Sequence, residues 1–529
     1  MKRLLAILLA CVLIFAIAAG CTPADSGTPA AGSGGGGGGG GGTAATDDLP
    51  LVTVNYMVTG DVPVNRTMTQ GLPALNELLR DRTNAELSVR WIEWTDFLAV
   101  YNLALAAQTG DLDLIGTATT WLDAWPNVQR GAFYAMSEEF IRTNAPQTWA
   151  QVPAAHWDEC KFDGTIYLFP EDNFAQWINH GWMYRGDWAR EAGLANGVQS
   201  WADLGTYMQY IKDTMPGVVP FNANGGVSLA NSITWGWITS HSPHIGIDGL
   251  RVGLFYGESK NNPYVLSRYF LEGDGLIEFA KNQQAWDQAG FWIEDVLNNS
   301  AADMRADMRI GINGVDQHHT NTFRGESFRL EEEIPGSDMG WYWFGQENNN
   351  LVAMNITHGC MAIAAQSNHP DRAAQVYDLL RNDIDIYRIL NNGIEGEQFI
   401  LRDDGITFDS PPDFNHDTDG IGFNWWWGRN DNLELRSGRI SWDKYLPLVD
   451  IYEAVAIPFP YGRIVFDLDP ISVELDALAN IWNTYIPRLA FGKFPDAEAF
   501  IAEFRGQLIA AGYEGVMEEV ERQLAAVYG

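Results

Sequence analysis

The feature that most constrains the fold is an alternation of strand-like and helix-like segments in the N-terminal part of the chain. Leu51–Val58 alternates and is β-branched, which is typical of a strand. Pro73–Arg82 places leucines on one helical face, and Glu86–Trp91 predicts a second strand. A helix over Asp96–Gln108 ends at a Thr-Gly pair, and Leu112–Ile115 begins a third strand. This order predicts an α/β, doubly wound body.

The alternation restarts near Thr165 and gives way to helices toward the C-terminus. The expected helices are Trp201–Met215, Ile277–Leu297, Pro370–Leu390, Pro470–Tyr485, Asp496–Ala511 and Tyr513–Val527. The expected strands are Val218–Phe221, Met308–Ile312 and a buried region within Met354–Ala364. The sequence therefore predicts two α/β bodies and a mostly helical C-terminal section.

Length and charge exclude several classes of protein. The chain has 529 residues, which at roughly 150 residues per domain suggests about three globular units. Its net charge is -35, from 33 basic and 68 acidic residues, and this argues against nucleic acid and against adsorption to anionic lipid. Four cysteines exclude a disulfide scaffold, and 21 tryptophans require packing or stacking roles.

The first 20 residues are predicted to be a signal peptide. Lys2 and Arg3 precede the apolar run Leu4–Ala19, which is slightly short for a transmembrane anchor, the alternative interpretation. Small residues then lead to Cys21 and resemble a bacterial lipobox, with Ala18 in place of the usual leucine. A lipid on Cys21 would anchor the chain to a membrane.

Residues 21–48 are predicted to be a lipid-anchored linker. They contain an unbroken run of nine glycines from Gly34 to Gly42, which cannot pack and is costly to order. About 27 residues of such coil span roughly 30 Å on average. The body is therefore expected to work just outside a membrane without entering it.

Four groups of motifs occur along the body. They are Asn102–Asp113; Phe162–Pro170 with Met183–Trp188, Ala192–Leu194 and Ser200–Leu204; Ser367–Ala374 with Asn392–Gly396; and Gly492–Asp496. Together they resemble the extracellular solute-binding lipoproteins of ABC importers, and more narrowly the large family 1-type carbohydrate-binding members. The resemblance covers nearly all of the body, and the second group is its most specific part.

The resemblance implies a two-lobed periplasmic-binding-protein-like type II fold with a hinge between the lobes. By analogy, lobe 1 comprises residues 49–170 plus 351–392, and lobe 2 comprises 171–350 plus 393–529. It also implies a monomer on the extracellular face of the cytoplasmic membrane, which binds a solute, expected to be an oligosaccharide, and delivers it to the permease subunits. No enzymatic activity and no cofactor are implied.

Candidate ligand-binding residues are aromatic and polar side chains in predicted loops. Indole faces stack on sugar rings, and Asn, Asp and Arg side chains bind hydroxyl groups. The candidates are Trp121, Asn222, Trp235, Asp316, Trp343, Trp425, Trp426, Trp427 and Arg429. Core packing is the alternative for each tryptophan. Alternate residues of an extended loop point in opposite directions, so Trp425 and Trp427 are expected to share one side of the loop and Trp426 to point to the other. One of these sides is expected to line the cleft, completed by the fork of donors of Arg429.

Three other groups of residues could bind a metal or form a disulfide, but no metal site is predicted. Asp413–Gly420 has the oxygen spacing of a calcium loop but lacks the terminal bidentate glutamate, which favours a solvated acidic turn. The His318–His319 pair has no further ligand at metal spacing and is expected in a solvated loop. Cys160 and Cys360 could pair, although Cys360 falls in a buried-strand pattern, where free thiols are common.

Two other functions remain open at the level of sequence. A lipid-anchored glycoside hydrolase would need two carboxylates about 5 to 10 Å apart, and no pair stands out. A sensory subunit would share the fold and differ only in its membrane partner. No metalloprotease, nucleophile-elbow or phosphate-loop motif is present.

Replacing Cys21 with serine tests the anchor. Cys21→Ser removes the thiol that accepts the lipid, so the variant is expected in the soluble fraction while the parent stays with membranes. Fractionation followed by immunoblotting measures this. Cys11→Ser, inside the leader, is the matched control, and a Cys21→Ser variant that remains membrane-bound would refute the lipoprotein interpretation.

Overall fold

The structure, a computed structural model, describes residues 50–529 except 96, 174–178 and 300–301. The predicted leader, Cys21 and the glycine run lie outside the described residues. Within the described ranges, none of the helices is both long enough and apolar enough to cross a membrane. These residues belong to one compact unit that contains two main β-sheets.

The first sheet contains the strands predicted near the N-terminus of the body, in the order β2-β1-β3-β12-β6. β1 (Val52–Thr59) is parallel to β2 (Ala85–Ile92) and β3 (Leu114–Thr117). β12 (Cys360–Ile363) returns from far along the chain and lies antiparallel between β3 and β6 (Leu168–Pro170). The predicted α/β fold is therefore confirmed, with a late segment inserted into the first sheet.

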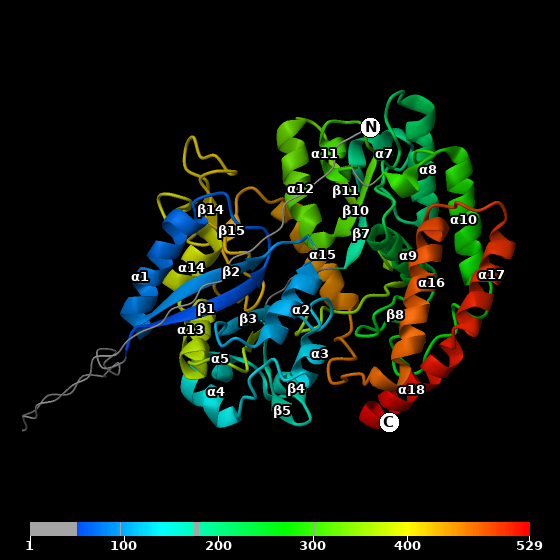
Figure 1. Cartoon of the computed structure of the whole chain (residues 1–529). Helices are drawn as coiled ribbons and strands as arrows, with labels where there is room; N and C mark the ends of the chain where they lie inside the picture. The colour runs from blue at the N-terminus through cyan, green and yellow to red at the C-terminus, as the bar shows by residue number, and fades with distance from the viewer. Residues whose placement is uncertain (1–49, 96, 174–178, 300–301) are drawn as a thin grey trace, which may run out of the picture. The chain divides into compact units, whose positions relative to one another are not determined.

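Helices cover this sheet because they present one apolar face to it. α1 (Leu72–Thr83) packs on β2, and α13 (Pro370–Asn382) packs on β1 (Figure 1). α1 has a proline in its first turn and ends at Asn84, whose φ of 48° stops the helix in the left-handed region. The other helices on this side are α2 (Phe97–Ala107), α3 (Ala124–Gln129), α4 (Glu138–Asn144), α5 (Pro146–Gln151), α6 (Ala154–Asp158) and α14 (Ile384–Asn392).

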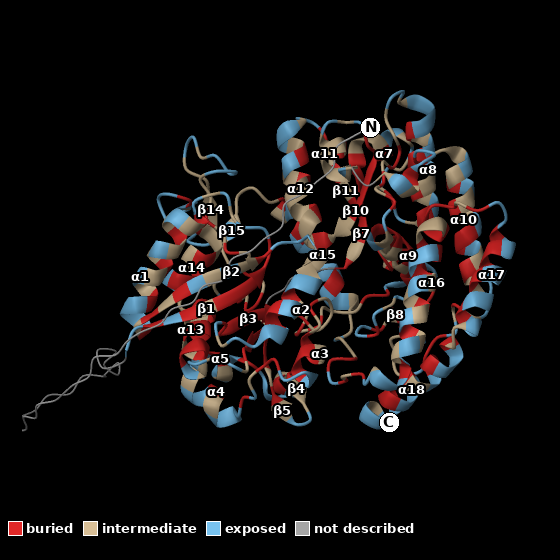
Figure 2. Cartoon of the chain, in the orientation of Figure 1, coloured by how far each residue is buried: buried red, intermediate tan, exposed pale blue. Residues whose placement is uncertain are grey.

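The second sheet is antiparallel, in the order β10-β7-β11. Its strands are β7 (His180–Arg185), β10 (Val315–His319) and β11 (Met339–Trp343). Successive residues of β7 enter different cores: Trp182 joins the large core of the surrounding helices, and Met183 joins a smaller core. The surrounding helices are α8 (Trp201–Thr214), α9 (Val227–His241), α10 (Gly275–Ala289), α16 (Ser472–Ala490), α17 (Ala497–Ala510) and α18 (Tyr513–Tyr528). Figure 2 shows that strands of both sheets are buried.

Shorter elements connect these layers. The remaining helices are α7 (Gly186–Glu191), α11 (Met304–Arg309), α12 (Thr320–Glu333) and α15 (Trp442–Val455), with single turns at Thr67–Gly71, Val296–Asn298, Gln346–Asn348 and Asp469–Ile471. The remaining strands are β4 (Lys161–Phe162), β5 (Thr165–Ile166), β8 (Ile245–Gly246), β9 (Tyr256–Gly257), β13 (Ile400–Leu401), β14 (Thr407–Asp409) and β15 (Arg436–Ser437). Cys160 and Cys360 are buried free thiols.

Four predicted elements are wrong in type or extent. The strand expected over Val218–Phe221 is not formed, and within it only Val219 makes an isolated β-bridge, to Asn313. The strand expected over Met308–Ile312 is the end of helix α11, because the Asp303 carboxylate accepts a hydrogen bond from the Ala306 amide and caps that helix. The helix expected over Ile277–Leu297 ends early, because Gly290 adopts a left-handed conformation with φ 72°. The helix expected over Pro370–Leu390 is divided at Asp383, which caps α14.

The segment 421–427 packs with the first sheet. Ile421, Phe423, Trp425 and Trp427 all belong to the hydrophobic core that surrounds β1 and β3. The resemblance to the solute-binding lipoproteins predicts that residues 393–529 belong to lobe 2. The lobe boundaries remain a proposal, and on this packing we propose that residues 421–430 belong with lobe 1.

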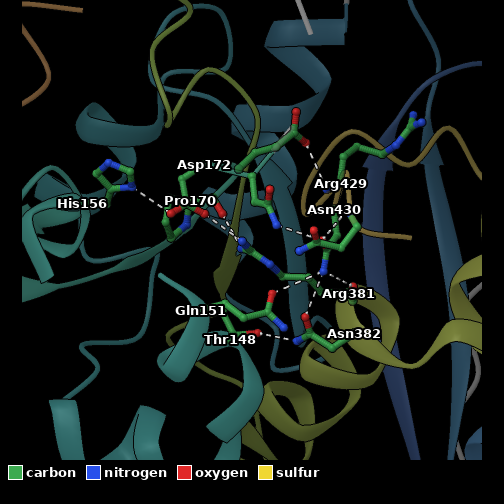
Figure 3. Close-up of polar contacts among 12 residues, drawn as sticks. Thr148, Gln151, His156, Pro170, Asp172, Arg381, Asn382, Arg429 and Asn430 are labelled. Atoms are coloured by element: carbon green, nitrogen blue, oxygen red, sulfur yellow. Dashed lines mark hydrogen bonds and ion pairs between the residues drawn. The ribbon is translucent and has the colours of Figure 1, made fainter. Parts of the chain in front are cut away.

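A buried ion pair fixes the chain where it leaves the first sheet. The Arg381 side chain is 0% exposed, and its Nη2 lies 2.7 Å from Asp172 Oδ1. Its Nη1 donates to the carbonyl of Pro170, the last residue of β6, at 2.6 Å. The other Asp172 oxygen lies 2.8 Å from His156 Nδ1 (Figure 3).

Asn430 extends this network to the 421–430 segment. Its side-chain amide donates to the carbonyl of Arg381 and to Gln151 Oε1, both at 3.3 Å (Figure 3). Its Oδ1 accepts a 2.9 Å hydrogen bond from Asn173. The outgoing chain, α13 and the 421–430 segment are therefore held by one polar cluster.

We predict that Arg381→Met lowers the free energy of unfolding by about 3–5 kcal/mol, because it leaves the Asp172 carboxylate buried without its cation. Urea unfolding followed by circular dichroism measures this. Arg522→Met is the matched control, since Arg522 pairs with Glu519 on the surface and its loss should cost less than about 1 kcal/mol. Equal losses for the two variants would contradict the prediction.

Candidate functional site

Two neighbouring cavities are lined by segments from both sheet regions. The first, here called the acidic cavity, has a volume of 710 Å³. One side is formed by residues 119–130 and by the turn between β4 and β5. The other side is formed by residues 248–251 and 459–469. Its charged lining residues are Asp123, Arg130, Asp163, Asp248, Arg251, Asp467 and Asp469.

The second cavity, here called the aromatic cavity, has a volume of 370 Å³. Both volumes fall in the range of about 300–1,000 Å³ that small-molecule sites occupy. The two cavities share Thr120, Asp248, Asn355 and Phe459, so they are adjacent parts of one hollow. The ring-bearing residues around the aromatic cavity are His180, Trp235, Phe255, Tyr256, Phe344, His358, Phe459 and Trp482.

Backbone and side-chain hydrogen bonds position the shared wall. Thr119 follows the carboxyl end of β3, where ligands commonly bind in open α/β sheets. Its amide donates to the Thr357 carbonyl at 3.0 Å. Thr120 Oγ1 lies 2.9 Å from His358 Nδ1, and Asn355 Nδ2 donates to Thr119 Oγ1 at 3.3 Å. The end of β3 is thereby joined to the segment that returns to β12.

Two tryptophans on neighbouring helices line the aromatic cavity. Trp235 lies on α9 and makes edge-to-face contacts with His180, at 5.7 Å between ring centroids, and with Phe344, at 5.9 Å. Trp482 lies on α16 and donates from Nε1 to Asn231 Oδ1 at 2.5 Å. A Cβ at Gly253 would lie 2.9 Å from this indole, so the glycine allows the backbone to approach Trp482.

Three imidazoles cluster beside this cavity. The His180 ring centroid lies 5.8 Å from that of His318 and 5.9 Å from that of His319. The predicted solvated loop for His318–His319 is wrong, because both residues end strand β10. Burial lowers the pKa of His180 to about 4, and burial together with neighbouring positive groups lowers those of His318 and His319 to about 2 and about 3. At neutral pH these rings are uncharged hydrogen-bonding groups.

Of the nine predicted ligand-binding residues, only Trp235 lines either cavity. It lies on α9, not in the loop expected from sequence. Asn222 bonds to Asp307 and Asn313 beside α11, and Asp316 is buried against Arg305, with Oδ2 2.9 Å from Nε. Trp343 is buried on β11 in the smaller core. Direct ligand contact by these three has no support from this geometry.

The triple-tryptophan loop alternates as predicted, but the shared side faces the core. Trp425 and Trp427 are 2% and 0% exposed, and Trp426 is half-buried on the other side. A Cβ at Gly116 of β3 would lie 2.7 Å from the Trp427 ring, so the sheet accommodates this indole only with a glycine there. The side that carries Trp425 and Trp427 therefore does not line a cleft, and the expectation that these two residues contact the ligand is corrected. Their apolar area stabilises the first sheet.

The Arg429 side chain forms an ion pair within the protein. Its Nη2 lies 2.5 Å from Glu434 Oε2, and its guanidinium carbon lies 5.3 Å from the Trp426 ring centroid. The predicted fork of donors exists, but its donors reach a carboxylate of the same chain. Arg429 also donates from its amide to Glu171, whose burial raises its pKa to about 8, partly opposed by Arg429.

Trp121 is the middle member of a column of indoles. Its ring centroid lies 5.7 Å from Trp427 and 5.9 Å from Trp94, with interplanar angles of 30° in both cases. Its Nε1 donates to the carbonyl of His358 at 3.1 Å. The column runs from the buried Trp427 to Trp94, which is 46% exposed. Trp121 thus supports the wall beside Thr120 without lining a cavity.

The acidic loop 413–420 is a turn closed by its own side chains. The Asn415 amide donates to Asp419 Oδ2 at 3.0 Å, and Arg66 lies 2.6 Å from Asp419 Oδ1. Among the residues that the structure describes, no group of three or more His, Cys, Asp or Glu side chains has an arrangement suited to a metal ion.

Several lining residues were missed by sequence reasoning. Asp248, Phe459, Tyr461 and Trp482 come from segments far apart in the chain, and the turn and extended residues among them carry no periodic pattern. One sequence feature could have pointed to this cavity wall: apolar and acidic residues alternate at Phe466–Asp469, just before a helix.

We predict that Trp427→Ala lowers the free energy of unfolding by about 3–5 kcal/mol, because it opens a cavity beneath β3. Urea unfolding measures this. Trp426→Ala, one residue away on the half-buried side, should cost clearly less. An equal or smaller loss for Trp427→Ala would contradict its assignment to the core.

Comparisons with known proteins agree with this architecture. The family model described as Domain of unknown function (DUF3502) matches residues 460–528, which include the 461–469 wall of the acidic cavity and helices α16 to α18. A carbohydrate ABC transporter substrate-binding protein of Streptococcus pneumoniae serotype 4 (strain ATCC BAA-334 / TIGR4) is 22% identical over 501 residues, 91% of each chain.

Solved structures share the fold at lower identity. The N-glycan transport solute binding protein NgtS of S. pneumoniae, also crystallised with Man1GlcNAc and Man5GlcNAc, has a TM-score of 0.69 at 17% identity and covers 90% of this chain and 98% of its own. The alginate-binding protein AlgQ2 without calcium ion has a TM-score of 0.63 at 16% identity, covering 91% and 99%. The predicted resemblance is confirmed: this chain has the fold of the two-domain solute-binding proteins of ABC importers.

Proposed function

We propose that this protein is the extracellular substrate-binding component of an ABC transporter that captures a carbohydrate, specifically an oligosaccharide. The observation that carries the proposal is the pair of adjacent cavities lined by both sheet regions. The carbohydrate transporter relative, similar along 91% of both chains, and the oligosaccharide complexes of NgtS support the same conclusion.

The lining suits sugar rings. The indole of Trp235 and the rings of Phe459 and Trp482 offer apolar surface to the C–H faces of a pyranose. The side-chain oxygen of Asn350, which has no hydrogen-bond partner among the described residues, can accept from a hydroxyl, and the uncharged His180 and His358 add donors and acceptors. The site is therefore matched to a ligand with both apolar ring faces and many hydroxyls.

Capture is proposed to close the cavities by a hinge motion of lobe 1 and lobe 2. The chain passes between the two sheets after β6 and again between β11 and β12. A ligand that contacts residues 119–130 and residues 459–469 at once favours the closed state over the open one. The permease subunits then receive the ligand from the closed form.

The remaining assignments are also proposals. The chain is expected to act as a monomer, tethered by lipid at Cys21 outside the cytoplasmic membrane, and to release its ligand chemically unchanged. The carboxylates of the acidic cavity are the groups that a glycoside hydrolase would use, so this alternative is tested directly. Mass spectrometry of a bound oligosaccharide after long incubation should show no cleavage.

A thermal-shift screen against oligosaccharides tests the function. A ligand at 100 times its Kd adds about 2.7 kcal/mol of stability, which is a readily measured rise in Tm. Neutral manno-, gluco-, galacto- and N-acetylglucosamine-based oligomers form the first panel. Stabilisation by none of the oligosaccharides, charged ones included, would contradict the proposal.

We predict that Trp235→Ala weakens binding of a stabilising oligosaccharide about tenfold, because the indole offers about 1–2 kcal/mol of stacking on a ring. Isothermal titration calorimetry measures the Kd, and the Tm without ligand should fall only slightly. Trp94→Ala, an exposed tryptophan outside both cavities, is the matched control. Unchanged affinity in Trp235→Ala would remove Trp235 from the site.

A further inference from the structure

The acidic cavity carries a marked excess of negative charge. Five aspartates line it: Asp123, Asp163, Asp248, Asp467 and Asp469. Among the described residues that line it, the cationic side chains are those of Arg130 and Arg251. Four of the carboxylates belong to exposed residues and Asp123 is half-buried, so water or a ligand in the cavity can reach them.

These carboxylates are not neutralised by the protein. Within the described residues, none of the five lies within 4.0 Å of a cationic group, whereas Arg251 lies 3.8 Å from Asp476, which is outside the cavity lining. Asp123 accepts a 2.9 Å hydrogen bond from the Asn102 amide, and Asp467 accepts a 3.1 Å bond from the Asp469 backbone. The charges of the five groups therefore face the cavity.

The surroundings of Asp248 disfavour the ionised form of its carboxylate. Asp248 lies where the acidic and aromatic cavities meet; it is exposed to the water of this hollow, but the protein around it partly desolvates the carboxylate and raises its pKa to about 6.

The hydrogen-bonding groups of the acidic cavity also favour an uncharged or amino-bearing ligand over an acidic one. An ionised carboxylate is an acceptor only, so it must be matched by donors on the ligand. Hydroxyl and ammonium groups supply donors, whereas uronate, sialate and sulfate groups are acceptors that would face other acceptors without an intervening cation. Such a contact costs both desolvation and repulsion.

We infer that the acidic cavity makes this protein selective for uncharged or amino-bearing oligosaccharides and that it rejects acidic ones. The inference rests on the proposed function and adds the charge class of the ligand. The aromatic cavity holds one ring by stacking, and the five aspartates accept hydroxyl or ammonium donors from the adjoining rings. Arg130 and Arg251 are too few to offset a chain of uronates.

Matched pairs of oligosaccharides test this selectivity by calorimetry. β-1,4-mannotetraose and β-1,4-tetramannuronate share ring stereochemistry and differ in C6, which is a hydroxymethyl group in one and a carboxylate in the other. Cellotetraose with tetraglucuronate and α-1,4-galactotetraose with tetragalacturonate extend the comparison. Chitotetraose with its fully deacetylated form tests the amino group.

In every pair of which a member binds, the neutral sugar should bind at least about tenfold more tightly than its uronate, because several like charges approach in a partly enclosed site. Deacetylation of chitotetraose should not abolish any binding. A uronate that binds as tightly as its neutral partner overturns the inference and leaves the proposed function intact. Failure of every sugar, neutral and acidic, overturns both.

Two further measurements distinguish selectivity by charge from selectivity by the shape of the ligand. Selectivity is measured as the Kd of the uronate divided by the Kd of its neutral partner. Asp248→Asn should lower this ratio about threefold or more. Asp403→Asn removes the same charge from an exposed residue outside the cavity lining and should leave the ratio unchanged. Raising NaCl from 20 to 500 mM should narrow the ratio for the parent protein through screening. Ratios unmoved by both Asp248→Asn and salt would overturn the electrostatic inference.

Discussion

The interaction on which the rest of the structure depends is the buried pair of Arg381 and Asp172. A buried guanidinium is costly unless carboxylates and carbonyls accept from it, and here Nη2 reaches a carboxylate and Nη1 reaches the carbonyl that ends β6. The pair therefore fixes the direction in which the chain leaves the first sheet. Because Asn430 joins the same cluster, the late 421–430 segment is held against the first sheet as well.

This fixed exit places the loops that form the cavities. β12 lies between β3 and β6, so the return segment 355–358 meets the end of β3 and bonds to Thr119 and Thr120. The opposite walls come from residues 248–251 and 459–469, which are supported by α9 and α16. The walls of the acidic cavity are thus largely loops on rigid elements, a common arrangement for functional residues.

Sequence reasoning succeeded where the information was local. The alternating pattern of β1 and the helix of α1 carry periodicity that neighbouring residues specify. It failed where tertiary packing decides the outcome. Trp425 and Trp427 alternate as expected, but the direction of that alternation depends on Gly116, more than 300 residues away, which leaves room for an indole. The cavity walls were missed because many separate segments build them, and no pattern in any one segment identifies the others.

The negative charge of the acidic cavity also affects how a bound ligand would favour closure of the cavity. Asp123 and Asp163 line it from the first-sheet side, and Asp248, Asp467 and Asp469 line it from the other. In the proposed function, bringing these walls together without a ligand places like charges closer in a shrinking volume of water, which opposes closure. A polyhydroxylated ligand replaces that water with donors directed at the same carboxylates. The groups that select the ligand would then also make closure depend on it, since only a bound donor offsets their repulsion.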